Sequence, residues 1–226
     1  MKKLGLILFL FLMVSLSVLA KEINIPKNFV LVEGDGNEIK DFYICKYEVT
    51  QGEYEELMGK NLSYLKGDNL PVESVTWYDA VMYCNKRSIK EGVKPYYSIN
   101  GTMVTEIGGN GYRLPETNEW EYAAKGGKKS KGYKYSGSNN YEEVCWYSGN
   151  SEGETHHVGI KLPNELGIYD MSGNVWEWTN TESESYRYSR GGSWISSVKF
   201  CDVTIQYFDN PDERSFDIGF RVCRFQ

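Results

Sequence analysis

The sequence has few of the residues that define several common classes of protein. It has two histidines and five cysteines, and no two cysteines have C-x-x-C spacing, so no motif supports a zinc site. Basic residues are also too few for a nucleic-acid partner: outside residues 1–20 there are 31 acidic and 23 basic residues. The chain has no internal repeat and no low-complexity linker. These absences indicate a single domain that does not bind nucleic acid.

Apart from the N-terminal run LGLILFLFLMVSLSVLA, the chain lacks long hydrophobic stretches. Lys2 and Lys3 precede this run, and Val18 and Ala20 occupy the −3 and −1 positions of a cleavage site, which predicts a signal peptide over residues 1–20. The alternative is an uncleaved anchor, but about 17 apolar residues fall short of the roughly 20 that a spanning helix needs. We therefore expect an exported protein, periplasmic or secreted, with a domain over residues 21–226 and no membrane span after cleavage.

The five cysteines cannot all pair within one chain. Export permits disulfides, but an odd number leaves at least one thiol free or bonded to another molecule. Cys84 shares an apolar helical stripe with Trp77 and Val81, which favours a buried thiol. Cys201 follows a Gly-Gly-Ser-Trp turn in a stretch with no helix or strand periodicity. Both a reactive thiol and a packing role remain open for Cys201.

Local patterns predict three helices in the first half of the chain. A capping box of Thr50 and Glu53 precedes GEYEELMG, a second helix begins at Thr76, and a third covers NEWEYAAK. Short strands are expected at residues 29–32, 42–47 and 219–224. Residues 126–193 show no long periodic segment, only turns rich in glycine, asparagine and serine. This pattern is typical of a single α+β domain with a loop-rich second half.

Four segments carry a family resemblance. They are YEVTQGEYEEL (47–57), YRLPETNEWEYAAKGG (112–127), NELGIYDMSGNVWEWT (164–179), and RGGSW with GFRVCR (190–194 and 219–224). In this order and at these separations they resemble the sulfatase-modifying-factor family, the formylglycine-generating enzyme domain, over nearly all of the mature chain. The resemblance implies a C-type-lectin-like fold with little regular secondary structure.

The same motifs also have a scaffold role. GNVWEWT is expected to form a tight turn and a short strand with Trp176 and Trp178 on alternate sides. RGGSW and GFRVCR are expected to be neighbouring strands.

The resemblance implies a calcium site around the turn before the W-E-W motif. The matching positions are Asp170, Gly173, Val175 and Glu177. Two carboxylates and two backbone carbonyls suit a hard cation. The alternative is that Asp170 caps the turn and Glu177 pairs with an arginine such as Arg190.

The resemblance also implies a test for redox chemistry. Formylglycine-generating members bind copper(I) through two cysteines, at the second and seventh residues after the aromatic of the Gly-Gly-Ser-aromatic turn, and oxidise a substrate cysteine with oxygen. Counting from Trp194, these positions hold Ser196 and Cys201. A hydroxyl is a poor ligand for a soft ion, so copper binding should fall sharply. Copper is expected as a cofactor, and Cys201 as a catalytic residue, only if the protein is an active enzyme.

The segment ISSVKFCDVTIQYFDNPDERSFDI, between RGGSW and GFRVCR, follows no helix or strand pattern. It resembles the variable region of retroelement-diversified proteins, which share the fold. Aromatic rings among small polar residues suit a binding surface because rigid rings contribute contact area at little entropic cost. We expect Tyr207, Phe208 and Phe216, together with Trp194, to contact a protein or surface ligand.

The sequence therefore predicts an exported ligand-binding or display module without formylglycine-generating activity. The alternative is a formylglycine-generating oxidase that acts on a sulfatase cysteine through Cys201. His156 and His157 lie side by side in a loop and are expected to be solvated rather than to bind metal.

Overall fold

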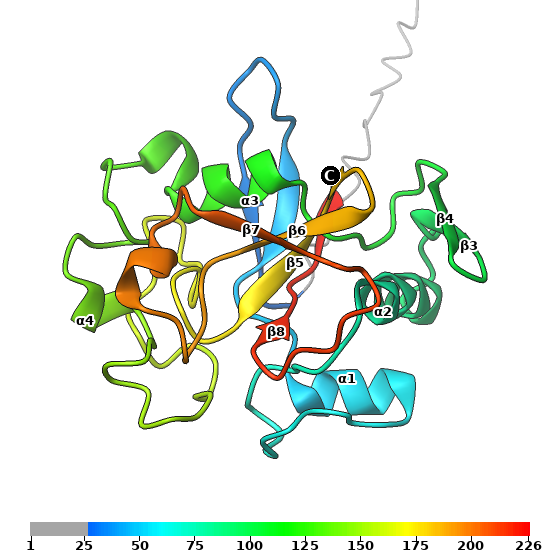
Figure 1. Ribbon diagram of the computed structural model, residues 1–226. Coiled ribbons are helices and arrows are strands. Elements are labelled where there is room, and N and C mark those ends of the chain that lie inside the picture. Colours follow the sequence, from blue (N-terminus) through cyan, green and yellow to red (C-terminus); the bar gives the residue numbers. More distant parts are fainter. Residues whose placement is uncertain (1–26) are drawn as a thin grey trace, which may run out of the picture.

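The computed structural model describes residues 27–226, so the expected signal peptide lies outside the described residues. This part of the chain has the predicted α+β composition (Figure 1). Its helices are α1 (Gln51–Met58), α2 (Trp77–Lys90), α3 (Thr117–Ala124) and α4 (Tyr141–Val144), with two short 3-10 helices, η1 (Gly127–Lys129) and η2 (Val198–Cys201). None of the helices in residues 27–226 is both long and apolar enough to cross a bilayer.

Two of the helices begin at the predicted capping residues. At the start of α1, the Glu53 N–H donates to Thr50 Oγ1 (3.3 Å) and the Thr50 N–H donates to Glu53 Oε2 (3.1 Å). Thr76 and Asp79 repeat this reciprocal box at the start of α2, at 3.0 and 3.1 Å. Gly59, with a φ of 77°, ends α1 in the left-handed region that favours glycine. Local sequence thus sets the ends of these helices.

The strands of the described residues form three sheets (Figure 1). The first is antiparallel, with β2 (Phe42–Cys45) between β1 (Phe29–Val32) and β9 (Cys223–Phe225). The second is a hairpin of β3 (Tyr97–Asn100) and β4 (Met103–Glu106), which projects at one side of the molecule beside α2. The third has the order β7 (Gln206–Asp209), β6 (Tyr186–Arg190), β5 (Trp176–Ser183) and β8 (Ile218–Gly219), in which β8 runs parallel to β5.

The third sheet corrects the prediction of an irregular second half. β5 contains the short strand expected at the W-E-W motif, whereas β6 up to Ser189 and β7 lie in segments that were expected to lack strands. Residues 176–180 of β5 are all buried, although Trp176 and Trp178 alternate with the polar Glu177 and Thr179, so both faces of this part of the strand are covered. The expected RGGSW strand is also wrong: β6 ends at Arg190, because Gly191 and Gly192 turn the chain with φ values of 100° and 77°. The expected strand over 219–224 is divided between β8 and β9.

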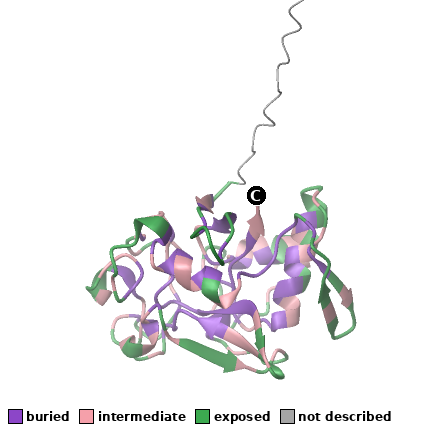
Figure 2. Ribbon diagram, turned by 90° about the horizontal axis from the view of Figure 1, so that it is seen from above, coloured by how far each residue is buried: buried purple, intermediate pink, exposed green. Residues whose placement is uncertain are grey.

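Aromatic side chains from distant segments fill the core. Trp77 and Trp178 are almost fully buried, and their indole N–H groups donate to the backbone carbonyls of Thr179 and Val75, each at 3.0 Å. Trp176 is also buried, since both faces of β5 are covered. Buried segments run through the middle of the molecule, whereas exposed residues gather in peripheral loops and in the β3–β4 hairpin (Figure 2). These buried indoles join the two halves of the chain.

Candidate functional site

The Gly-Gly-Ser-Trp turn holds Ser196 in a polar network. The Ser193 hydroxyl donates to Asp217 Oδ2 (2.8 Å), and Ser196 Oγ lies 2.9 Å from Ser193 Oγ. Because Ser193 has a single hydroxyl proton, the Ser196 hydroxyl is the donor in the second bond. The backbone N–H of Ser193 also donates to Ser196 Oγ, at 3.1 Å. Ser196 therefore has oxygen and nitrogen partners suited to a hydroxyl.

Cys201 occupies a different environment. Its side chain is fully buried in a small cluster with Tyr135, Val144 and Cys145. The Cys145 thiol lies within hydrogen-bond reach of the Cys201 thiol, and this contact, followed by burial, raises the pKa of Cys145. Cys201 and Cys145 therefore share one buried cluster, and both are free thiols in the structure. Sequence reasoning missed Cys145 because nothing in its spacing connects it with Cys201.

The expected metal residues lie in a buried polar region. Glu177 Oε2 accepts the Trp120 indole N–H and the Arg221 Nε–H, both at 2.6 Å, while Oε1 accepts from Arg221 Nη2 at 2.5 Å. The arginine that pairs with Glu177 is therefore Arg221. The expected alternative partner, Arg190, instead pairs with Glu121 at 2.9 Å.

Asp170 has an oxygen available for a cation. Its Oδ2 accepts the Gly159 N–H at 2.7 Å, whereas Oδ1 is buried and has no hydrogen-bond partner within residues 27–226. Burial raises the pKa of Asp170 to about 6 and also raises that of buried Glu48, which the negative charges of Asp170 and Glu177 raise further. Arg221 forms its ion pair with Glu177, and its positive charge lowers the pKa values of Asp170 and Glu48 less than burial raises them.

This environment fits a hard divalent cation. The predicted calcium set combines two carboxylates with the backbone carbonyls of Gly173 and Val175, and the free oxygen of Asp170 is of the required type. Within residues 27–226, no group of three or more His, Cys, Asp or Glu side chains is arranged to hold a metal. The expected set contains only two such side chains, so calcium at Asp170 and Glu177 remains a prediction.

The predicted contact aromatics are exposed and lie on buried tryptophans. An aromatic face is formed by five residues that are each at least 43% exposed: Tyr64, Tyr186, Tyr207, Phe208 and Phe216. Trp194 is nearly buried, and its ring centroid lies 5.7 Å from that of Phe216. On the sheet, Tyr207 lies 6.1 Å from buried Trp176 and stacks on Phe208 at 5.8 Å. Trp194 is therefore not an exposed contact residue as expected, and its ring packs beneath Phe216.

The exposed rings form two rows, one that starts at buried Trp194 and one that starts at buried Trp176, and the two tryptophans belong to neighbouring segments. The Trp176 N–H donates to the carbonyl of Asp217 (2.8 Å), the residue after Phe216. The row from Phe216 continues to Tyr64 at 6.1 Å, and the row on β7 continues from Phe208 to Tyr186 at 5.4 Å. This arrangement joins a loop of the first half of the chain to the segment after the Gly-Gly-Ser-Trp turn.

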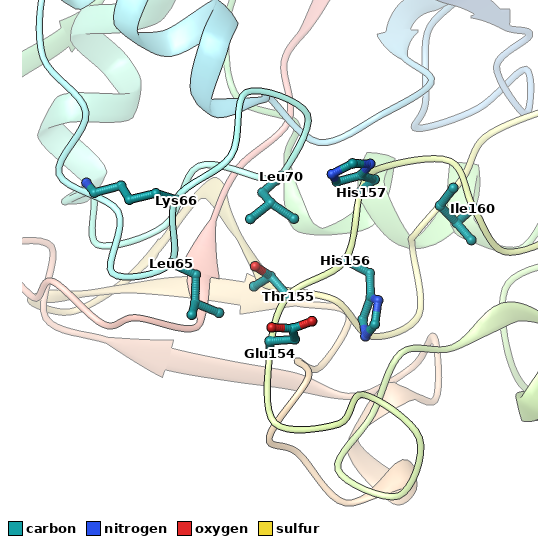
Figure 3. A pocket seen from close by; sticks show the side chains of 8 residues that line it. All are labelled: Leu65, Lys66, Leu70, Glu154, Thr155, His156, His157 and Ile160. Carbon is teal, nitrogen blue, oxygen red and sulfur yellow. The ribbon is translucent and has the colours of Figure 1, made fainter.

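A pocket of about 440 Å³ lies beside the loop that carries Tyr64 (Figure 3). Figure 3 shows that two loops form its walls. One contributes Leu65, Lys66 and Leu70, and the other contributes Glu154, Thr155, His156, His157 and Ile160. Thr155 Oγ1 is buried without a partner among the described residues. His156 stacks on Trp146 with 3.7 Å between centroids, and its Nε2 lies 2.9 Å from Ser151 O. The expectation that this ring is solvated is therefore wrong.

The loop-rich α+β architecture and the Gly-Gly-Ser-Trp turn define a C-type-lectin-like domain of the formylglycine-generating type. The chain belongs to the family described as the sulfatase-modifying factor enzyme 1-like domain, whose model matches residues 32–225.

Relatives within this family differ in their described roles. Over 226 aligned residues, the chain is 44% identical to the chaperone protein LppX of Paenibacillus barcinonensis, covering 82% of this chain and 81% of that protein. It is 31% identical to the inactive C-alpha-formylglycine-generating enzyme 2 of Bos taurus, over 68% of this chain and 50% of that protein. Among solved structures, Treponema denticola variable protein 1 is similar, with a TM-score of 0.75 and 31% identity over 88% of this chain and 92% of that chain.

Proposed function

We propose that this protein is an exported ligand-binding or display module that does not generate formylglycine. The observation that carries the proposal is that Ser196 and Cys201, the two positions that hold the catalytic cysteines in formylglycine-generating members, lie in different environments. Ser196 belongs to a hydroxyl–carboxylate network, and Cys201 is buried against Cys145. A copper(I) ion needs two soft ligands, and a serine hydroxyl does not supply one. The similarity to a relative described as inactive supports the same conclusion.

The aromatic face is the proposed contact surface. Tyr207 and Phe208 stand half-exposed on β7, while Phe216 extends the surface toward Tyr64. Exposed rings on a rigid sheet provide contact area without a large loss of side-chain entropy on binding. The relative named as a chaperone supports a protein ligand for this chain. The similarity to a variable protein supports sequence diversification of the segment that carries Tyr207 and Phe216.

Calcium is the proposed cofactor, and it has a structural role. An ion at Asp170, Gly173, Val175 and Glu177 would favour the charged forms of the buried carboxylates of Asp170 and Glu48, whose pKa values burial raises, and would hold the turn before β5. Copper enters the proposal only as the cofactor of the alternative, an active enzyme that uses Cys201.

An aldehyde assay tests the absence of catalysis. The purified protein is incubated with copper(I), oxygen and a peptide containing a sulfatase-type cysteine, and the peptide is examined by mass spectrometry. We expect the peptide mass to remain unchanged. Formation of an aldehyde by the unmodified protein, and its loss in Cys201→Ser, would establish the enzyme instead.

A comparison of matched variants tests the contact surface. Immobilised wild-type protein is compared with Tyr207→Ala/Phe208→Ala for retention of proteins from the producing cells. We expect a protein retained by the wild type to lose at least about tenfold in affinity, because two central aromatic contacts each contribute on the order of 1 kcal/mol or more. Met103→Ala, on the β3–β4 hairpin and also exposed, is the control and should bind normally. Equal retention by all three proteins would place the contact surface elsewhere.

A further inference from the structure

Two cysteines that are far apart in sequence have adjacent thiols. Cys145 follows α4 and Cys201 ends η2, and both side chains are fully buried. They belong to the same small cluster, and their thiols are within hydrogen-bond reach. The other cysteines lie in different clusters, with Cys45 and Cys84 in one and Cys223 in another.

Backbone contacts hold the two cysteine segments side by side. The Ser148 N–H donates to the carbonyl of Ser196 (3.0 Å), and the Ser151 hydroxyl donates to the carbonyl of Trp194 (2.8 Å). Between the two segments, the Ser172 hydroxyl donates to the carbonyl of Cys201 (2.8 Å). These bonds fix the segments relative to each other.

Gly192 provides the space for the Cys201 side chain. A Cβ atom at this position would lie 2.9 Å from Cys201 Sγ and 2.9 Å from the carbonyl oxygen of Phe200. Its φ of 77° also lies in the region that favours glycine. The Gly-Gly turn thus allows the Cys201 thiol to lie against the backbone and face its neighbour.

We propose that Cys145 and Cys201 form a disulfide that fastens the segment leading to the aromatic face to the loop after α4. Both are free thiols in the structure, and sulfurs of one small buried cluster need only a short approach to reach the S–S bond length of about 2.05 Å. The bond would leave Cys45, Cys84 and Cys223 as buried thiols, which accounts for the odd number of cysteines. The inference depends on neither ligand binding nor calcium.

The oxidation requires an electron acceptor, and the acceptor we name is the disulfide of a thiol–disulfide exchange oxidant. One cysteine loses its proton and attacks that disulfide, which forms a mixed disulfide and releases one thiol of the oxidant. The second cysteine loses its proton and attacks the mixed disulfide, which releases the second thiol. Two electrons thus pass to the oxidant, and each protein sulfur loses one proton. Because burial disfavours the thiolate, the bond should form before the cluster closes during folding.

Thiol mapping of the refolded chain tests the pairing. The reduced, unfolded protein is refolded with oxidised and reduced glutathione, unfolded again without reductant, alkylated and digested. We expect three alkylated cysteines, Cys45, Cys84 and Cys223, and one linked peptide that joins Cys145 to Cys201. Five alkylated cysteines, or a different linked pair, would overturn the proposal. The mapping uses the unmodified chain, so it does not depend on the folding of any variant.

Thermal unfolding gives a second readout. Reduction of the wild type should lower the melting temperature by about 5–15 °C, since a disulfide closing a loop of this kind contributes roughly 2–4 kcal/mol. Cys201→Ser should unfold at the same temperature with and without reductant. Cys84→Ser is the matched control, because it removes a buried thiol outside the pair, and it should keep the response to reductant. A reductant response that disappears in Cys84→Ser and persists in Cys201→Ser would contradict the pairing.

Discussion

The buried pair of Glu177 and Arg221 shows how much one residue can affect the stability of this domain. Neither side chain is exposed, and the guanidinium donates to both carboxylate oxygens. Glu177→Gln leaves the Arg221 charge buried without this partner, so we expect the free energy of unfolding to fall by about 3–5 kcal/mol. Urea unfolding followed by tryptophan fluorescence measures the difference.

An exposed ion pair provides the control for that substitution. Glu56 and Lys90 lie 2.7 Å apart, and both side chains are more than half exposed. Glu56→Gln should leave the free energy of unfolding nearly unchanged, because water and salt screen an exposed pair. Similar losses in Glu56→Gln and Glu177→Gln would mean that burial does not decide the effect.

Calcium binding is also tested at a single residue. An ion that binds only the folded state stabilises it by about 3 kcal/mol at a hundredfold excess over Kd. A chelator should therefore lower the melting temperature of the wild type by several degrees. Asp170→Asn removes one of the two carboxylates of the predicted set, so we expect its melting temperature to respond much less to the chelator. An exposed acid supplies the control, and Asp212→Asn should respond as the wild type does.

The chelator response has a clear contradictory outcome. An identical melting curve for the wild type with and without chelator, together with no calcium by elemental analysis, would remove the predicted site. The short distances between Glu177 and Arg221 would then mark an ion pair that needs no metal.

Motifs predicted single residues well only where the partners are close in sequence. The family resemblance singled out Asp170 and Glu177, and both are buried in the same polar region. The partner arginine could not be chosen, because Arg221 reaches Glu177 only after β8 pairs with β5. Cys145 was missed for the same reason, since its contact with Cys201 exists only in the folded chain.

At the scale of elements, helix α2 depends on its capping box. The Thr76 side chain accepts the Asp79 N–H at 3.0 Å, and the Asp79 carboxylate also pairs with Arg214 at 2.6 Å. Thr76→Ala removes the cap, and we expect the free energy of unfolding to fall by about 1 kcal/mol. Thr102→Ala, in the exposed turn of the β3–β4 hairpin, is the control and should have little effect. Equal stability of both variants in urea would show that the cap is dispensable.

Helices and strands could be predicted where the residues that specify them lie close together in the sequence. The start of α1 was predicted from the capping box of Thr50 and Glu53, and that of α2 from Thr76 before an apolar stripe, and the structure confirms both. The short strand at the W-E-W motif was predicted, but its extension to Ser183 and its pairing with β6 were not, because the register shifts between Trp178 and Glu182 and no local pattern specifies β6. The position of β7 depends on pairing with β6, which no local pattern specifies.

At the scale of the whole molecule, the last residues of the chain close two sheets. β8 pairs with β5, and β9 pairs with β2 near the beginning of the domain. Between them, Phe220, Arg221 and Val222 are fully buried. The carbonyls of Phe220 and Val222 accept the N–H groups of Val49 and Cys45, each at 2.9 Å. The C-terminal segment is therefore part of the centre of the fold.

This closure predicts that the domain unfolds as one unit when its end is removed. Deletion of residues 218–226 would remove β8 and β9, the Arg221 guanidinium and the buried ring of Phe220. Loss of that ring alone costs about 3–5 kcal/mol. Removal of Arg221 also leaves the buried carboxylate of Glu177 without its ion-pair partner, which adds a comparable loss. Since domains of this kind are stable by only about 5–15 kcal/mol, we expect no cooperative thermal transition and no near-ultraviolet circular dichroism from the tryptophans. Deletion of exposed Gln226 alone is the control and should leave both signals intact. A cooperative transition in the longer deletion would show that the first sheet and the β5–β6 hairpin fold without the C-terminal strands.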